Sequence, residues 1–64
     1  MSKLPVLTAI EAERLLLHAG YKLLRVKGGH RIYIKDNLRI IIPFHAGKAL
    51  YPKIIKQVLK SIEL

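Results

Sequence analysis

One histidine of this chain stands in a short basic stretch whose glycines predict a sharp turn. The stretch RVKGGHRIYI places His30 directly after Gly28 and Gly29 and between the cations Lys27 and Arg31. Imidazole gains and loses a proton near neutral pH, and lysine and arginine side chains bind phosphate oxygens. These residue types are the ones needed to move a proton beside a phosphate group, as in RNA cleavage by the ribose 2′-hydroxyl.

The composition points to a polyanion as the partner of this chain. Its 64 residues include 12 Lys and Arg against 4 Asp and Glu, which gives a net charge of +8. So large an excess on so small a body creates a positive field that attracts nucleic acid, and an acidic protein would fit the same field. No cysteine is present, which excludes disulfides and cysteine-based zinc sites. We predict one domain over residues 1–64, without a metal or cofactor.

The apolar segments are too short for a membrane protein. The run over residues 4–10 is interrupted by Pro5 and Thr8 and leads directly into acidic residues, unlike a signal peptide. The other run, residues 40–42, is far shorter than a bilayer requires. We therefore expect no membrane contact and a cytoplasmic location.

Two amphipathic segments predict helices near the two ends of the chain. Thr8 and Glu11 form a capping box before the first segment, and Gly20 follows it, which predicts a helix over residues 9–19. Its expected core face carries Ala12, Leu15, Leu16 and Ala19, and its wetter side Glu11, Glu13, Arg14 and His18. Pro52 suits the first turn of a second helix, whose apolar face would carry Ile54, Ile55, Val58, Leu59 and Ile62.

The segment between these helices predicts three strands, over residues 21–27, 30–35 and 38–42. The Gly-Gly and Asp-Asn pairs between them are typical of tight turns, and Pro43 is expected to end the third strand. Strict alternation places His30 in phase with Ile32 and Ile34, which we expect to face the helices. Tyr33 would then lie on the open face, where it could stack on a base.

The predicted order is helix, strand, strand, strand, helix. An antiparallel meander with both helices on one face is an economical way to bury such a pattern. The expected fold class is therefore α+β, a three-stranded antiparallel sheet covered on one face by two helices, as in double-stranded-RNA-binding domains.

Two motifs at this separation resemble the HicA toxin family, small mRNA interferases of toxin–antitoxin modules. The first is KGGHRIY, in which Gly28, His30 and Tyr33 match the family's glycine, histidine and aromatic residue. The second is the segment IIPFH, in which Ile42, Pro43 and His45 match the pattern Ile-Pro-x-His. The resemblance extends from the first helix to Leu64.

The resemblance implies a double-stranded-RNA-binding-domain-like fold, metal-independent cleavage of mRNA with His30 as the catalytic residue, and neutralisation by a HicB-like antitoxin. Two positions depart from the family: Gly29 replaces the usual serine, and Arg31 stands where a second histidine is common. His45, Tyr33 or Lys48 could supply a second proton-transfer group if the loop after the third strand folds back toward the turn. The expected RNA contacts are Arg25, Lys27, Gly28, Gly29, Arg31, Tyr33, His45 and Lys48.

Two other functions fit the same sequence. A non-catalytic RNA-binding module could use the same basic surface to bind RNA by its backbone and shape. An interaction protein could use that surface mainly to receive an acidic partner. Cleavage of RNA would distinguish an mRNA-cleaving toxin from both alternatives.

Overall fold

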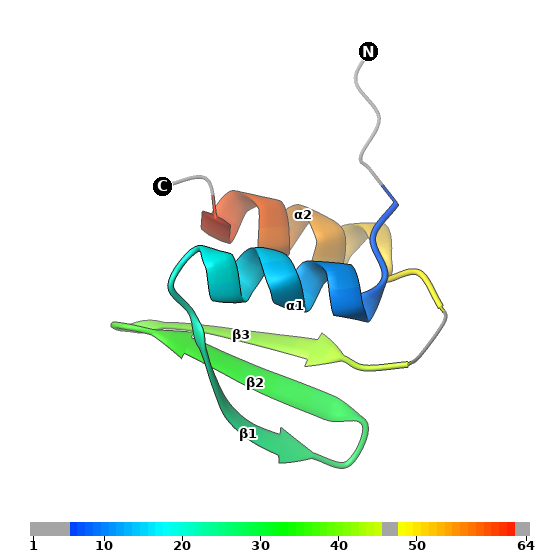
Figure 1. Ribbon diagram of the computed structural model, residues 1–64. Coiled ribbons are helices and arrows are strands. Elements are labelled where there is room, and N and C mark those ends of the chain that lie inside the picture. The colour runs from blue at the N-terminus through cyan, green and yellow to red at the C-terminus, as the bar shows by residue number, and fades with distance from the viewer. Residues whose placement is uncertain (1–5, 46–47, 63–64) are drawn as a thin grey trace.

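The chain folds into a three-stranded sheet with two helices on one of its faces (Figure 1). In the computed structural model, residues 6–45 and 48–62 are described. The elements are α1 (Ala9–His18), β1 (Lys22–Lys27), β2 (His30–Lys35), β3 (Leu38–Pro43) and α2 (Pro52–Ile62). Both neighbouring strand pairs are antiparallel, in the order β1-β2-β3. The α+β prediction is confirmed, with strand and helix ends within a residue of those expected.

Helix α1 begins at the predicted residue and ends at His18, one residue before the predicted end. The Thr8 hydroxyl accepts from the Glu11 backbone N–H while the Glu11 carboxylate accepts from the Thr8 backbone N–H, which completes the capping box. At the other end Gly20 has a φ of 105°, a conformation that non-glycine residues rarely adopt. These signals fix both ends of the helix and therefore where β1 begins.

The turns between the strands also follow their local sequence. Gly28 has a φ of 59°, as the first central residue of a type II′ hairpin requires. Asp36, at the turn between β2 and β3, has a φ of 53°, which aspartate tolerates better than most residues. Tight turns of this kind hold the three strands in one register.

The predicted faces of β2 are wrong: the helices cover the face that carries Arg31, Tyr33 and Lys35. Tyr33 is 0% exposed and its hydroxyl donates to the Glu13 carboxylate of α1. The Lys35 ammonium donates to the Ala19 carbonyl at the end of α1. We call this side of the sheet the covered face and the opposite side the open face.

The physical reason is that long amphipathic side chains can lie under a helix when their polar ends find partners there. Ile32 and Ile34, which we expected in the core, point the other way and share the open face with His30 because side chains alternate along a strand. His30 therefore does not face the helices, as strict alternation had predicted together with Ile32 and Ile34, and it is exposed.

The core lies between the helices and the covered face of β2 and β3. Its fully buried side chains include Leu16 from α1, Tyr33, Ile42 and Val58 from α2. Strand β1 lies at the edge of the sheet, and all six of its residues are exposed. Strand β1 therefore contributes little to the core and leaves its side chains available for contacts.

Candidate nucleic-acid interface and catalytic site

The hairpin that joins β1 and β2 presents His30 at the first position of its strand. Lys27 and His30 are paired across the strands, so their side chains lie on the same face. Residues 28–29, here called the hairpin tip, complete the turn between them. The register of the two strands thus places the Lys27 ammonium on the same face as the His30 imidazole.

A β-bulge brings a second cation to the same face. The register shifts between Leu23 and Arg25, which leaves Leu24 as the extra residue of the edge strand. A bulge reverses the alternation beyond it, so Arg25 pairs with Ile32, and Arg25 joins Lys27 on the open face. Without the bulge, strict alternation would direct Arg25 toward the covered face with Leu23.

The open face next to His30 is hollowed and partly apolar. A shallow depression of about 570 Å³ is lined by Lys27, Gly28, His30, Ile32 and Ile41. Ile41 is paired with Ile32 and remains 45% exposed. An apolar floor with a basic rim can accept a nucleobase on the floor and a phosphate at the rim.

Arg31 and Tyr33 lie on the covered face, which corrects the prediction that Tyr33 stacks on RNA from the open face. Both side chains donate to one oxygen of Glu13, at 2.8 Å from Arg31 and 2.5 Å from Tyr33. The Arg31 guanidinium also lies 3.9 Å from the centre of the Phe44 ring, a cation–π contact. These interactions attach β2 to α1 and use the charge that we expected to meet phosphate.

The electrostatics of this cluster favour the ion pair. Burial by itself would raise the pKa of Glu13, but hydrogen bonds from Tyr33 and Arg31 and the charge of Arg31 lower the pKa below its usual 4.5. Burial and the hydrogen bond to Glu13 raise the pKa of Tyr33. The hydrogen bond to Glu13 likewise raises the pKa of Arg31. At neutral pH the cluster therefore holds a carboxylate, a neutral phenol and a guanidinium.

The loop after β3 folds back onto the hairpin tip. The Phe44 backbone N–H donates to the Gly29 carbonyl over 2.6 Å. The Cε1 atom of His45 lies 3.9 Å from the point where a Cβ atom on Gly29 would stand. His45 is therefore held beside the residue that precedes His30, although the two histidines are 15 positions apart in sequence.

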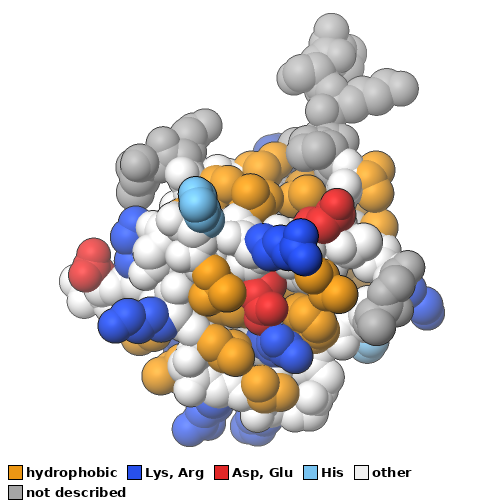
Figure 2. All heavy atoms as spheres, viewed as in Figure 1, with side chains coloured by type: hydrophobic (Ala, Val, Ile, Leu, Met, Phe, Trp, Pro, Cys, Tyr) orange, Lys and Arg blue, Asp and Glu red, His pale blue; other side chains and the backbone are white. Residues whose placement is uncertain are grey.

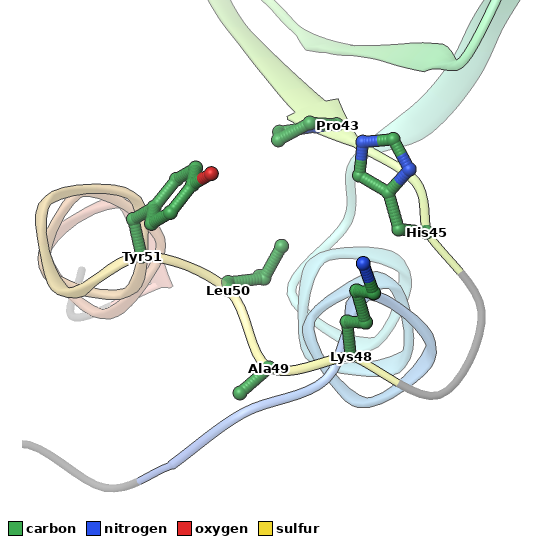
Figure 3. A pocket seen from close by; sticks show the side chains of 6 residues that line it. All are labelled: Pro43, His45, Lys48, Ala49, Leu50 and Tyr51. Carbon is green, nitrogen blue, oxygen red and sulfur yellow. The ribbon is translucent and has the colours of Figure 1, made fainter.

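His45 also lines a pocket of about 210 Å³ with Pro43, Lys48, Ala49, Leu50 and Tyr51. In Figure 3 the ring of His45, the Lys48 ammonium and the Tyr51 hydroxyl surround one space, with Leu50 between them. Tyr51 is 72% exposed, which leaves its ring free to stack. The pocket joins a proton-transfer group, a cation and an aromatic ring at the end of the sheet that carries the hairpin tip.

Most of the predicted site residues therefore converge. Arg25, Lys27, Gly28, Gly29 and His30 lie in one hairpin, and His45 and Lys48 line a pocket beside it. Sequence reasoning missed Tyr51 and the pocket role of Pro43. No sequence pattern singles out Tyr51, because its spacing to Ile54, Ile55 and Val58 is that of the apolar face of the helix.

Comparison with known proteins gives one finding. The family model described as the HicA toxin of bacterial toxin–antitoxin systems matches residues 10–64. The chain belongs to the HicA toxin family. No curated protein and no solved structure matches it.

Membership makes this HicA-family protein a toxin of the toxin–antitoxin type and implies an antitoxin partner. Both sequence motifs, at the hairpin tip and at the end of β3, fall within the matched residues. In the part of the chain that the structure describes, no helix is long and apolar enough to cross a membrane.

Proposed function

We propose that this HicA-family toxin is a metal-independent endoribonuclease that cleaves mRNA, with His30 as a general acid or base. The observation that carries the proposal is the exposed position of His30 on the open face, paired with Lys27 beside the glycine turn. Because RNA contains its own nucleophile, the protein needs only to move protons and to stabilise the charge on the phosphate.

The phosphate contacts come from the open face and the neighbouring loop. Arg25 and Lys27 lie on the same face as His30, and Lys48 lines the same pocket as His45. Arg31 is excluded from this set because Glu13 and Phe44 hold its guanidinium on the covered face. The backbone of Gly28 and Gly29 leaves room for RNA to approach the tip closely.

The experiment is cleavage of an unstructured RNA in the presence of a chelator, by wild type, His30→Ala and His18→Ala. His18 is an exposed histidine in the last turn of α1 and serves as the matched control. We expect wild type and His18→Ala to yield a 2′,3′-cyclic phosphate and a 5′-hydroxyl, and His30→Ala to be slower by about 10²- to 10⁴-fold.

Undiminished cleavage by His30→Ala would contradict the assignment of His30. Binding of RNA that weakens with salt, without turnover by wild type, would instead support a non-catalytic RNA-binding module.

We further propose that the antitoxin is a HicB-like acidic protein. The net charge of +8 favours an acidic partner, and the exposed Leu23, Leu24 and Val26 of β1 offer apolar contact area beside the basic residues. Figure 2 shows apolar and basic side chains intermixed on one side of the molecule. Co-purification with the acidic product of an adjacent reading frame, with loss of cleavage in the complex, would support this partner. A mixture that forms no complex would contradict it.

A further inference from the structure

The fold-back of the loop after β3 places a second histidine at the candidate site. Phe44 is bonded to the Gly29 carbonyl, and this contact fixes the backbone immediately before His45. The imidazole of His45 then lies against the hairpin tip, with its Cε1 atom 3.9 Å from the Cβ position of Gly29. A phosphate bound at the tip would therefore lie near both His45 and His30, which directly follows Gly29.

We propose that His45 is the general acid of RNA cleavage, opposite His30 as the base, and that the pocket beside His45 holds the nucleoside that leaves. This inference rests on the proposed nuclease function and names the second proton-transfer group and the subsite of the leaving product.

The pocket is small, and its lining suits one nucleoside. Its volume of about 210 Å³ is below the roughly 300–1,000 Å³ of pockets for drug-sized ligands. Tyr51 offers an exposed ring on which a nucleobase can stack. Leu50 gives the pocket an apolar surface, and Lys48 supplies positive charge for a phosphate oxygen (Figure 3).

The depression on the open face then takes the nucleoside on the other side of the scissile phosphate. Ile32 and Ile41 form its apolar floor, and Lys27 and His30 stand at its rim. The RNA would cross from this floor, over the hairpin tip, into the pocket of His45. In this arrangement the imidazole of His30 serves the 2′-hydroxyl, and that of His45 serves the leaving oxygen.

The step balances without any other reactant. Neutral His30 takes the proton of the 2′-hydroxyl, the O2′ atom forms a bond to phosphorus, and the bond from phosphorus to O5′ breaks. Protonated His45 gives its proton to O5′. The products are a 2′,3′-cyclic phosphate and a 5′-hydroxyl, and the two histidines exchange protonation states.

Other groups able to transfer a proton are less suitable among the described residues. Tyr33, which sequence reasoning considered, is buried under α1 and bonded to Glu13. His18 lies in the last turn of α1, whose end is on the opposite side of the molecule from the β1–β2 turn (Figure 1). Lys48 shares the pocket, but an ammonium group serves better as a fixed charge on the phosphate.

The test compares two substrates whose leaving groups differ in their need for an acid. In a short RNA the leaving group is a nucleoside 5′-alkoxide, which needs a proton. Uridine 3′-(4-nitrophenyl phosphate) instead releases 4-nitrophenolate, which needs none. We expect His45→Ala and His45→Gln to slow RNA cleavage by about 10²- to 10⁴-fold and to leave the nitrophenyl ester nearly unaffected. We expect His30→Ala to slow both reactions, and His18→Ala to slow neither.

The outcomes separate this inference from the proposed function. Equal losses on both substrates in the two His45 variants would overturn the role of His45 as acid, and so would no loss on either. Loss on the ester in His45→Ala but not in His30→Ala would reverse the two roles and also overturn the assignment. Wild-type protein that cleaves neither substrate would contradict the nuclease function itself.

The leaving-group pocket has its own readout in the same assay. Tyr51→Ala is expected to weaken cleavage of RNA, which places a nucleoside against the ring, and to leave the nitrophenyl ester unchanged because that substrate has no second nucleoside. A Tyr51→Ala variant with wild-type activity on RNA would show that the pocket does not hold the leaving nucleoside.

Discussion

The two faces of β2 carry alternating residues of one short strand but have opposite tasks. On the covered face Arg31, Tyr33 and Lys35 are each bonded to α1. On the open face His30 is exposed and Ile32 and Ile34 are only partly buried. The difference shows how a small domain can hold an exposed side chain in place: one face of the strand is bonded to a helix, and the other face remains free.

The same comparison explains why Arg31 and His30 do not belong to one site, although they are neighbours in sequence. Successive side chains of a strand point to opposite faces. Arg31 is paired with Glu13 in a partly buried contact, whereas Lys27 and Arg25 share the face of His30 through register and a bulge. The cation next to His30 in sequence, Arg31, therefore lies on the opposite face, and the cation that shares its face is its cross-strand partner Lys27.

The largest expected effect comes from the covered face. Tyr33→Ala should destabilise the fold by about 3–5 kcal/mol because it empties a fully buried site, and Tyr33→Phe by about 1.5–3 kcal/mol because it removes a hydrogen bond to a carboxylate. Urea denaturation followed by circular dichroism measures both. The open-face control, Ile41→Thr, should stay within about 0.5 kcal/mol of wild type. Equal losses at Tyr33 and Ile41 would contradict the assignment of the faces.

The second prediction uses acid to weaken the ion pair and hydrogen bond of Glu13 on the covered face. Glu13 has a pKa below its usual value of 4.5 in the folded protein, so it contributes stability that is fully present above the unfolded pKa. That contribution is lost as the pH falls from about 5 through the lowered pKa of the folded state. The midpoint of urea denaturation should therefore fall with pH below 5 in wild type.

Glu13→Gln should be less stable at neutral pH and should lose part of this acid dependence, because its amide does not titrate. Identical slopes of stability against pH in wild type and Glu13→Gln would show that the carboxylate does not fasten β2 to α1.

The smallest expected effects lie at the hairpin tip, where two adjacent glycines form a matched pair. Gly28 has a φ of 59°, so Gly28→Ala should cost about 1–2 kcal/mol. Gly29 is outside the left-handed region, and a Cβ there would meet His45 only at 3.9 Å. Gly29→Ala should therefore stay within about 0.5 kcal/mol of wild type. A larger loss at Gly29 than at Gly28 in denaturation experiments would contradict this description of the turn.

The order of elements followed from local signals that act on a few neighbouring residues. The capping box at Thr8 and Glu11, the glycine at position 20 and the two turns each fix the backbone where they stand, so helix and strand boundaries were predictable. The identity of the covered face was not predictable from β2 alone, because it depends on which side chains of β2 find partners in α1.

The missed signal was in the helix. Ala9, Ala12, Glu13 and Leu16 have the spacing i, i+3, i+4 and i+7, and three of them are buried. Their shared face carries Glu13 toward the sheet. An acidic residue on that stripe predicts cations and hydroxyl donors beneath it, which describes Arg31 and Tyr33 and not the isoleucines. The proximity of His45 to Gly29 depends on a loop fold, and no local pattern indicates it.

The most direct test of the division of β2 measures cleavage and stability on the same preparations of His30→Ala and Tyr33→Phe. We predict that His30→Ala loses at least about 10²-fold in the rate of RNA cleavage with an unfolding free energy within about 0.5 kcal/mol of wild type. Tyr33→Phe should lose stability and, under conditions where it is folded, cleave RNA at the wild-type rate. A His30→Ala variant that is destabilised but still cleaves RNA, or a folded Tyr33→Phe variant that does not, would contradict the account.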